Sequence, residues 1–489
     1  MLVDALLAAN RTYPKKLAVD DGRLTLTYKQ LTSLSVVLRD IVGSATRSDK
    51  VGIMLPAGSL FPAALFGVLW SGKTAVPLNF MLSAAELRYV IKDAGLDVIL
   101  TVTHFQELTG QLDTRAICLD KLPLKRKLIW KMLLPTPALP NVDAQDTAVV
   151  LYTSGTTSQP KGVELTYRNL RSNCIDVIFS LEMQPDQSFL DILPPFHVFG
   201  LTCNVLIPVT LGASVYAIPR FNPAAVVRTV ARNRVSIIMA IPSMYAAILR
   251  LKSAKPDSFS TVVLAVSGGE PLAERIRTGF QERFALALRE GYGLTETSPV
   301  LAAGSVKHHK PGSVGKAIRN VQCRIVDQHG NDLPTGSDGE LWVKGPGIMK
   351  GYLNKPQDTK QVINELGWFK TGDIARLDED GFVSITGRSK EMLIIGGENV
   401  APREIETALE QHQDVLQAAV IGVADQSRGE APIAFVICRE GAEVTESQLR
   451  SFAKKSLAGF KVPKQIHLRD DLPMTPTGKI LKRKLPELL

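Results

Sequence analysis

The sequence is poor in cysteine and shows no pattern that would pair the cysteines it has. Its 489 residues include five cysteines, and no two of them stand in a Cys-x-x-Cys spacing. An odd number without close pairs argues against a disulfide scaffold and against a cysteine zinc site, and it favours a reducing compartment. The seven histidines also lack a metal-binding spacing such as His-Glu-x-x-His.

Long apolar runs are missing as well. No window of about 18 uninterrupted apolar residues occurs, which argues against a transmembrane helix. The N-terminus, Met-Leu-Val-Asp-Ala-Leu-Leu-Ala-Ala-Asn, lacks the basic segment and the long apolar core of a signal peptide. The C-terminus reads Pro-Glu-Leu-Leu rather than the peroxisomal Ser-Lys-Leu. We therefore expect a cytoplasmic protein.

Positive charge, in contrast, is abundant. The net charge is +9 and the pI is near 9.2, which suits anionic partners such as a nucleotide, coenzyme A (CoA), an acidic carrier protein or a membrane surface. No nucleic-acid-binding motif accompanies the charge, so we expect no nucleic-acid partner. Within residues 124–134, four cations alternate with apolar residues: Lys125, Arg126, Lys127 and Lys131. This pattern is typical either of a surface helix with one face in the core or of a helix that lies on anionic lipid.

The length of the chain predicts two or more domains. Up to about residue 300, apolar helical patterns alternate with short β-rich runs, which predicts α/β architecture with mainly parallel strands. From about residue 311 to residue 385, short strands separated by Gly- and Asp-containing turns predict a small β-rich barrel or sheet. The remainder returns to a mixed α/β pattern and ends in a basic tail.

The most informative stretch is residues 150–163, Val-Leu-Tyr-Thr-Ser-Gly-Thr-Thr-Ser-Gln-Pro-Lys-Gly-Val. The apolar run 148–151 before it predicts a buried strand, and Thr166 after it is suited to cap a helix that begins near Tyr167. A loop with many N–H and O–H donors and one ammonium, that of Lys161, suits a polyphosphate. Composition alone is equally typical of a polar linker, but the order of the residues argues against a linker.

A second phosphate-binding pattern is present but stands in the wrong context. Residues 67–74 match the P-loop pattern G-x-x-x-x-G-K-[ST], which requires a strand before the loop and a helix after it. Here residues 61–70 predict an apolar helix, and residues 75–78 predict a short strand that contains a proline. The order is inverted, so we reject a P-loop.

The string Thr-Ser-Gly-Thr-Thr-x-x-Pro-Lys-Gly resembles the phosphate-binding loop of the adenylate-forming (ANL) superfamily, which contains acyl-CoA synthetases, amino-acid adenylation domains and beetle luciferases. Further family motifs follow in order, and the resemblance covers nearly the whole chain. It implies an α/β N-terminal AMP-binding domain, residues 1–386, with two α/β subdomains and a small β-barrel-like region. A hinge at residues 387–390 and a small mobile α+β lid, residues 391–489, complete the expected fold.

The resemblance also implies residue roles. In Glu290-Gly-Tyr-Gly-Leu-Thr-Glu296, Tyr292 would stack on adenine, and Glu296 with Thr153 would bind Mg²⁺. Asp373 and Arg388 would contact the ribose. The expected catalytic residues are Lys479, Thr153, Glu296 and His197, and the expected metal ligands are Glu296 and Thr153. The residues expected to bind nucleotide or CoA are Thr153, Ser154, Gly155, Thr156, Thr157, Lys161, Ser267, Gly268, Gly269, Glu270, Glu290, Gly291, Tyr292, Gly293, Thr295, Asp373, Arg388, Lys390, Gly397 and Lys479.

These roles agree with the chemistry. Joining a carboxylate to a triphosphate brings two anions together, so Mg²⁺ and lysine are needed to screen charge. A carboxylate such as that of Asp373 can accept hydrogen bonds from both ribose hydroxyls. A glycine-flanked lysine, Lys479, on a mobile lid can bring a positive charge to the transferring group. Lys390 stands at the pivot where many relatives carry aspartate.

The sequence indicates the identity of the acid substrate less directly. Residues 195–200 lie where relatives meet the acyl carboxylate, and they contain no acidic residue that could pair with an α-ammonium group. Relatives specific for acetate or propionate carry a bulky aromatic residue at the position of Gly293, so a deeper pocket is expected here. The sequence therefore predicts activation of a medium- or long-chain fatty acid to acyl-AMP with release of pyrophosphate, and aryl acids stay open as substrates.

CoA is the expected acceptor. Fatty acyl-AMP ligases, which hand the adenylate to an acyl carrier protein, typically carry an insertion before the hinge, and the short spacing from Tyr352 to Trp368 leaves little space for one. The intact set of predicted site residues argues against a non-catalytic nucleotide-binding scaffold, and the missing peroxisomal ending argues against a luciferase-like oxidase. We expect an AMP-forming fatty acid–CoA ligase that uses ATP, Mg²⁺ and CoA, and peripheral contact with an anionic membrane is a further hypothesis.

Overall fold

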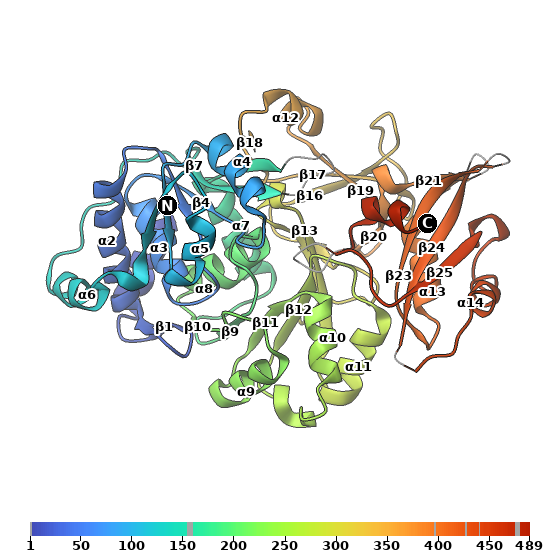
Figure 1. The fold of residues 1–489 in the computed structure, drawn as a ribbon, viewed down its shortest axis with the longest axis horizontal. Coiled ribbons are helices and arrows are strands. Elements are labelled where there is room, and N and C mark those ends of the chain that lie inside the picture. Colours follow the sequence, from blue (N-terminus) through green and yellow to red (C-terminus); the bar gives the residue numbers. More distant parts are fainter. Residues whose placement is uncertain (1, 154–159, 396–397, 426–427, 440, 475–479) are drawn as a thin grey trace. The chain divides into compact units, whose positions relative to one another are not determined.

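The computed structural model describes residues 2–153, 160–395, 398–425, 428–439, 441–474 and 480–489. Contacts within the chain define two compact units, each assembled from several segments (Figure 1). The first unit contains residues 1–269, 278–322 and 344–369, and the second contains residues 270–277, 323–343 and 370–489. The predicted boundaries at residues 386 and 390 stay predictions.

The first unit contains two sheets whose strands are mainly parallel, as the alternation of patterns predicts. Within the described residues, the larger sheet has nine strands, in the order β15 (Lys316–Ala317), β14 (Val300–Ala303), β13 (Leu288–Gly293), β12 (Leu264–Gly268), β11 (Ile237–Ala240), β9 (Ser188–Asp191), β10 (Ser214–Ala217), β1 (Leu17–Asp20) and β2 (Thr25–Thr27). The second sheet has seven described strands, in the order β18 (Gly351–Tyr352), β8 (Lys161–Thr166), β7 (Thr147–Thr153), β4 (Thr74–Pro77), β3 (Lys50–Ile53), β5 (Val98–Thr101) and β6 (Arg115–Cys118).

Helices surround these sheets. Those of the first unit are α1 (Leu2–Thr12), α2 (Tyr28–Ala45), α3 (Leu60–Trp70), α4 (Ala84–Ala94), α5 (Gln106–Thr109), α6 (Leu124–Leu133), α7 (Tyr167–Ser180), α8 (Ile207–Leu211), α9 (Pro223–Asn233), α10 (Pro242–Arg250) and α12 (Pro356–Val362). Helix α11 (Glu274–Phe284) begins in the second unit and continues into the first. Every helix within the described ranges is too short or too polar to cross a bilayer.

The rejected P-loop pattern belongs to the core. Residues 61–70 of α3 are all buried, and α3 packs against α2 and against strands β3 and β4. A Cβ on Gly67 would lie 2.8 Å from the Cβ of Leu38, so the glycine allows α2 and α3 to approach each other closely. The predicted order of helix and then strand, α3 and then β4, is confirmed, and the pattern is explained by helix packing.

The predicted start of the helix after the phosphate loop is also confirmed. Helix α7 begins at Tyr167, and the side chain of Thr166 accepts a hydrogen bond from the backbone N–H of Asn169. The side chain of Asn169 accepts one from the backbone N–H of Thr166 in return. This reciprocal cap satisfies two backbone donors at the helix start.

The second unit contains the remaining β-rich segments. One sheet has four described strands, in the order β16 (Gln322–Val326), β17 (Asp338–Lys344), β19 (Phe369–Leu377) and β20 (Val383–Arg388). Another contains β22 (Glu398–Val400), β21 (Leu393–Ile395), β24 (Gly429–Cys438), β23 (Val415–Asp425) and β25 (Gln465–Arg469), with β25 paired to β24. Helices α13 (Pro402–Glu410) and α14 (Glu446–Ala453) pack with the latter strands.

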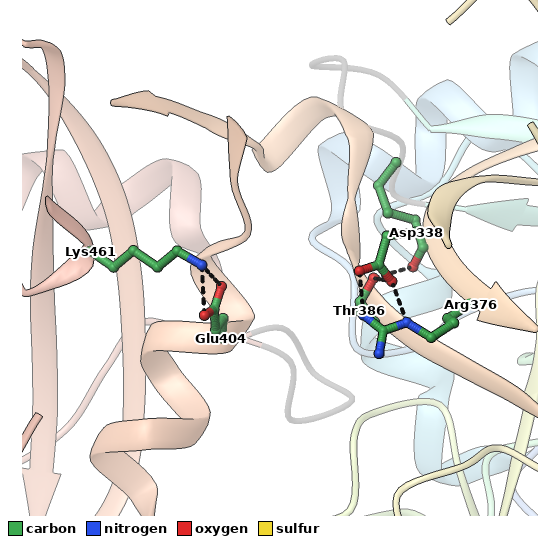
Figure 2. Close-up of polar contacts among 6 residues, drawn as sticks. Asp338, Arg376, Thr386, Glu404 and Lys461 are labelled. Carbon is green, nitrogen blue, oxygen red and sulfur yellow. Dashed lines mark hydrogen bonds and ion pairs between the residues drawn. The ribbon is translucent and has the colours of Figure 1, made fainter. Parts of the chain in front are cut away.

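Two groups of polar contacts join elements of this unit (Figure 2). Asp338 on β17 forms an ion pair with Arg376 on β19 at 2.6 Å and accepts a hydrogen bond from Thr386 on β20. Lys461 forms an ion pair with Glu404 in the first turn of α13 at 2.7 Å. The first group ties three neighbouring strands together, and the second fastens the segment before β25 to α13.

Candidate active site

Three of the predicted motifs lie at one edge of the nine-stranded sheet. Strands β9, β11, β12 and β13 run parallel to one another, so their C-terminal ends meet at the same edge. The segment 195–200 follows β9, residues 267–269 end or follow β12, and residues 292–295 end or follow β13. Ligands of open α/β sheets bind beyond the C-terminal ends of the strands, so this edge is the candidate active site of the first unit.

The expected adenine and acyl segments are direct neighbours. In the register of β12 and β13, Ser267 stands opposite Glu290 and Gly268 stands opposite Gly291. Gly269 follows with a φ of +86°, a conformation that favours glycine, and Glu270 comes next in the chain. Tyr292 continues β13 beyond this pair. The two segments predicted to share a ligand therefore lie side by side on adjacent strands.

Gly293 is required by the backbone. A Cβ at this position would lie 2.0 Å from the carbonyl oxygen of Pro299, a distance that no side chain could relieve by rotating. Strands β13 and β14 pair antiparallel here, with a register irregularity between Tyr292 and Gly293. This close approach explains the glycine without reference to the acid, so Gly293 gives no support to the expected deep acyl pocket.

The phosphate loop connects two strands of the other sheet. Strands β7 and β8 are antiparallel, and Thr153 at the end of β7 pairs with Lys161 at the start of β8. Residues 148–151 of β7 are buried as predicted. Lys161 forms an ion pair with Asp358, N to O 2.7 Å, and the hydrogen bond from Lys161 holds the pKa of Asp358 below its usual value. Four predicted ligands of this loop lie outside the described residues: Ser154, Gly155, Thr156 and Thr157.

Tyr352 connects Lys161 with Glu296. Its hydroxyl donates a hydrogen bond of 2.8 Å to Oε1 of Glu296, and its ring centroid lies 5.1 Å from Nζ of Lys161, within cation–π range. Strand β18 places it there, because Tyr352 pairs with Val163 on β8. Burial and the neighbouring charge of Glu296 raise the pKa of Tyr352 far above its ordinary value, so the hydroxyl remains a donor. Lys161, Tyr352, Glu296 and Asp358 form one connected cluster.

Glu296 suits the role of Mg²⁺ ligand. Mg²⁺ is usually held by one or two carboxylates together with substrate phosphates and water. A carboxylate offers about four acceptor positions, and Tyr352 takes one on Glu296. No group of three or more His, Cys, Asp or Glu side chains that could hold a metal occurs in the part of the chain that the structure describes. The Glu296 carboxylate therefore keeps acceptor positions for Mg²⁺, and the joint site with Thr153 stays a prediction.

The segment around His197 packs through aromatic contacts. The ring of His197 lies 5.0 Å from that of Phe196, which in turn meets Phe80 edge to face at 4.9 Å. At the end of β9, Asp191 is fully buried and accepts a hydrogen bond of 3.3 Å from Asn204. Burial raises the pKa of Asp191 to about 7. His197 thus follows β9 in the chain and packs against Phe196.

The residues expected at the ribose meet within the second unit. Asp373 on β19 pairs directly with Arg388 on β20, and Nε of Arg388 lies 2.9 Å from Oδ1 of Asp373. The Asp373 side chain is 4% exposed and that of Arg388 is 51% exposed. The buried carboxylate therefore orients a guanidinium that is accessible to a ligand. Lys390 follows in a short 3₁₀ helix, residues 389–391. The expected ligand Gly397 lies outside the described residues.

Lys479 also lies outside the described residues, but the segments on both sides of it are described. Met474 and Ile480 form an antiparallel bridge, and the N–H of Leu481 donates to the carbonyl of Pro473 at 2.7 Å. The two ends of the predicted lysine loop are therefore joined.

Lys482 then fixes this segment. Its ammonium lies 2.8 Å from Glu391 and 2.7 Å from Glu406. Burial alone would lower the pKa of Lys482, but the two carboxylates outweigh it and hold the pKa above its ordinary value. Glu406 also pairs with Arg403, at 3.5 Å. These ion pairs therefore connect Lys482, which follows Lys479, to Glu391, which follows the predicted pivot residue Lys390.

Sequence reasoning missed Tyr352, Asp358 and Lys482 as members of these clusters. Tyr352 and Asp358 are far from Lys161 in the sequence, and the pairing of β18 with β8 brings them to it. No local sequence pattern predicts that pairing of strands. Lys482 could have been singled out only by its position three residues after Lys479, within a basic run.

Comparisons with known proteins show the family of the chain. The family model described as AMP-binding enzyme matches residues 6–353, and that of its C-terminal domain matches residues 404–479. A long-chain-fatty-acid–CoA ligase of Yersinia pestis is 34% identical, covering 90% of this chain and 85% of its own. A feruloyl-CoA synthase of Amycolatopsis is 33% identical over 96% of both chains. The structure of ATP-bound MatB from Rhodopseudomonas palustris is 28% identical and has a TM-score of 0.91, covering 100% of this chain and 99% of that one.

The fold and the site thus define an adenylate-forming enzyme with a large α/β N-terminal domain and a small C-terminal domain. The chain belongs to the AMP-binding enzyme family. Within it the chain is an AMP-forming acid–CoA ligase, which works with ATP, Mg²⁺ and CoA. The predicted superfamily, fold class and enzyme class are confirmed, whereas the roles of the individual site residues stay predictions.

Proposed function

We propose that this enzyme activates a medium- or long-chain fatty acid. The acid attacks the α-phosphate of ATP to give acyl-AMP and pyrophosphate, and CoA then displaces AMP to give acyl-CoA. The observation that carries the proposal is the identity of about one third with long-chain-fatty-acid–CoA ligases over most of both chains. The absence of an acidic side chain in residues 195–200 supports it, because an amino acid would need such a partner for its ammonium group.

The side chains of the site suit the first step. We assign Lys161 and Glu296 to the triphosphate end, where Mg²⁺ when bound would screen the negative charge between the two reacting anions. The Tyr352 hydroxyl holds the Glu296 carboxylate at 2.8 Å and its ring lies against Lys161, so both ligands keep fixed positions. His197 is assigned to the acyl carboxylate, and Lys479 to the charge that develops during the transfer.

The ribose is assigned to Asp373 and Arg388. A buried carboxylate fixed by an arginine can accept hydrogen bonds from the two ribose hydroxyls. In this proposal the 3₁₀ helix with Lys390 and the loop that contains Gly397 serve the second step, in which the thiol of CoA must reach the acyl-AMP.

An aryl acid is the second candidate. The feruloyl-CoA synthase is nearly as similar as the fatty-acid ligases and matches almost end to end. Gly293 does not decide between the two, because the backbone of Pro299 already requires a glycine there. The choice therefore depends on substrate measurements.

A panel of acids tests the proposal. Butyrate, dodecanoate, hexadecanoate, benzoate and ferulate are each incubated with ATP and Mg²⁺, with and without CoA, and AMP, pyrophosphate and thioester are quantified. We expect kcat/KM for dodecanoate or hexadecanoate to exceed that for butyrate, since each added methylene contributes about 0.8 kcal/mol when it is buried. Higher kcat/KM for ferulate or benzoate would overturn the fatty-acid assignment in favour of an aryl acid.

The same incubations test CoA as the acceptor of the acyl group, and the vesicle-binding experiment described below tests the membrane setting. Accumulation of acyl-AMP without thioester when CoA is present, followed by transfer to an acyl carrier protein, would overturn the choice of CoA. We also propose that the enzyme meets its substrate at an anionic membrane, where long-chain acids partition and where its charge of +9 is attracted.

A further inference from the structure

Helix α6 lies outside the core of the first unit. It packs on α2, which itself packs on α3 (Figure 1). None of the residues of α6 is buried. Leu124, Leu128 and Met132 are half-buried on one side, so part of the helix rests on the protein, as expected for a surface helix with one face toward the core.

The other side of α6 exposes large apolar residues. Exposure reaches 62% for Ile129, 62% for Trp130 and 77% for Leu133, and Leu134 just after the helix is 50% exposed. A single exposed leucine needs no explanation, but four such residues at the end of one short helix form a patch. The patch leaves apolar surface in water that a partner could cover.

Cations lie beside this patch. Lys125, Arg126 and Lys127 occupy the first turn, are all exposed, and form no ion pair with any residue that the structure describes. Lys131, in the last turn, instead pairs with Asp40 of α2 at 2.7 Å. No acidic residue occurs in α6. The exposed side of the helix is therefore basic in its first turn and apolar in its last.

An open groove adjoins the same side chains. It has a volume of about 530 Å³ and lies between α2 and α6. Its lining comprises Val37, Asp40, Ile41, Ser44, Pro123, Arg126, Lys127, Trp130 and Lys131. Trp130, Arg126 and Lys127 thus line this groove and are exposed to solvent.

We propose that α6 is a docking surface for an anionic lipid bilayer. The helix would lie in the interface, with Ile129, Trp130 and Leu133 among the upper acyl chains and Lys125–Lys127 at the phosphates. Lys and Arg beside Trp and Leu are typical of interfacial helices, whereas lysine is depleted from the centres of protein–protein interfaces. Charge complementarity therefore favours lipid over an acidic protein.

The proposal rests on the proposed function, since it concerns where the enzyme meets its fatty acid. Membrane binding can nevertheless be tested separately from the identity of the acid. Vesicle binding is measured with the full-length protein in the absence of ATP, acid and CoA. A failure to bind vesicles would leave the acid panel unaffected, and the wrong acid in that panel would leave vesicle binding unaffected.

The experiment compares three proteins by co-sedimentation with vesicles of phosphatidylcholine alone or of phosphatidylcholine with phosphatidylglycerol. The test variant carries Lys125→Gln, Arg126→Gln and Lys127→Gln. The matched control removes three exposed cations elsewhere in the same unit, through Arg228→Gln, Arg232→Gln and Lys252→Gln. Both variants lose the same charge, so a nonspecific effect of net charge would weaken binding equally in the two.

We expect the parent protein to bind only the anionic vesicles and to release them in high salt. Each cation near such a surface contributes about fivefold in affinity, so the test variant should lose on the order of 100-fold while the control loses little. Equal loss in both variants, or no binding by the parent protein, would overturn the proposal.

A second variant tests the apolar contact. Trp130→Ser with Leu133→Ser keeps every charge, and the proposal expects weaker binding that is lost at a lower salt concentration than the binding of the parent protein, because only the electrostatic attraction remains. Unchanged binding would mean that the helix does not insert. Near-normal pyrophosphate exchange with a short, soluble acid checks that each variant is folded, because α6 contains none of the assigned site residues.

Discussion

The hydrogen bond from Tyr352 to Glu296 gives the sharpest test of the phosphate end of the site. Tyr352→Phe removes one hydroxyl and leaves the ring, so the contact with Lys161 at 5.1 Å is kept while the 2.8 Å bond to the carboxylate is lost. A hydrogen bond to a charged group contributes about 1.5–3 kcal/mol. Both side chains are partly exposed, so the lower value is appropriate, and it corresponds to about tenfold.

This loss should appear in the dependence on Mg²⁺. If Tyr352 orients Glu296 as a metal ligand, the Mg²⁺ concentration for half-maximal ATP–pyrophosphate exchange should rise about tenfold, while KM for the acid stays constant. Calorimetry of ATP binding in the presence of Mg²⁺ should show the same weakening without any turnover. Tyr352→Leu should cost a further few-fold, because the ring over Lys161 is lost as well.

Tyr28→Phe is the matched control. The Tyr28 hydroxyl is buried and has an uncharged partner, since it donates to the backbone carbonyl of Ala213 at 2.6 Å. Its removal should lower the free energy of unfolding without changing the Mg²⁺ dependence. The same Mg²⁺ dependence in Tyr352→Phe as in the parent enzyme would refute the assignment of Glu296 and Tyr352 to the metal end.

Four further changes have defined outcomes. Lys479→Ala should slow pyrophosphate exchange on the order of 10²–10³-fold without changing the melting temperature. Lys482→Met should lower the free energy of unfolding in urea by about 2–3 kcal/mol, because it removes the ammonium that Glu391 and the buried Glu406 share, and Lys482→Arg should restore most of it. In the parent protein the free energy of unfolding should fall as the pH rises from about 4, where Asp191 ionises in the unfolded chain, to about 7, where it ionises in the folded protein. Asp191→Asn should reduce this pH dependence, because asparagine stays neutral. Gly293→Ala should lower the melting temperature and the activity towards every acid alike, since its Cβ would meet the Pro299 carbonyl.

Local features of the fold were predictable from the sequence because local chemistry decides them. Thr166 caps α7 because a threonine hydroxyl can accept from the first turn wherever an N-terminus follows it. The false P-loop at residues 67–74 was recognisable because its helix came before its strand. The motifs that follow β9, β12 and β13 could be expected to meet, because parallel strands bring their C-terminal ends to one edge.

Contacts between distant strands were not predictable in this way. Nothing in the sequence near Tyr352 shows that β18 pairs with β8, yet that pairing decides that Tyr352 lies between Lys161 and Glu296. Gly293 is the opposite case, because the structure gives a reason for this residue that differs from the one the sequence suggested. The resemblance assigned it a role in substrate size, whereas the approach of the Pro299 carbonyl to within 2.0 Å of its absent Cβ gives a backbone reason.

The partners of Lys161 also bear on how the site can exchange ligands. Its ion pair with Asp358 has a short distance, 2.7 Å, but both side chains are partly exposed, at 23% and 33%. Water screens such a pair, so breaking it costs little. A triphosphate with Mg²⁺ presents more charge and more acceptor oxygens than one carboxylate. Lys161 can therefore leave Asp358 for a phosphate without a large penalty, while the ring of Tyr352 limits where the ammonium can go. The same tyrosine contacts both Lys161 and Glu296, the proposed metal ligand. This shared support is the reason why the loss of a single hydroxyl is expected to change the Mg²⁺ dependence.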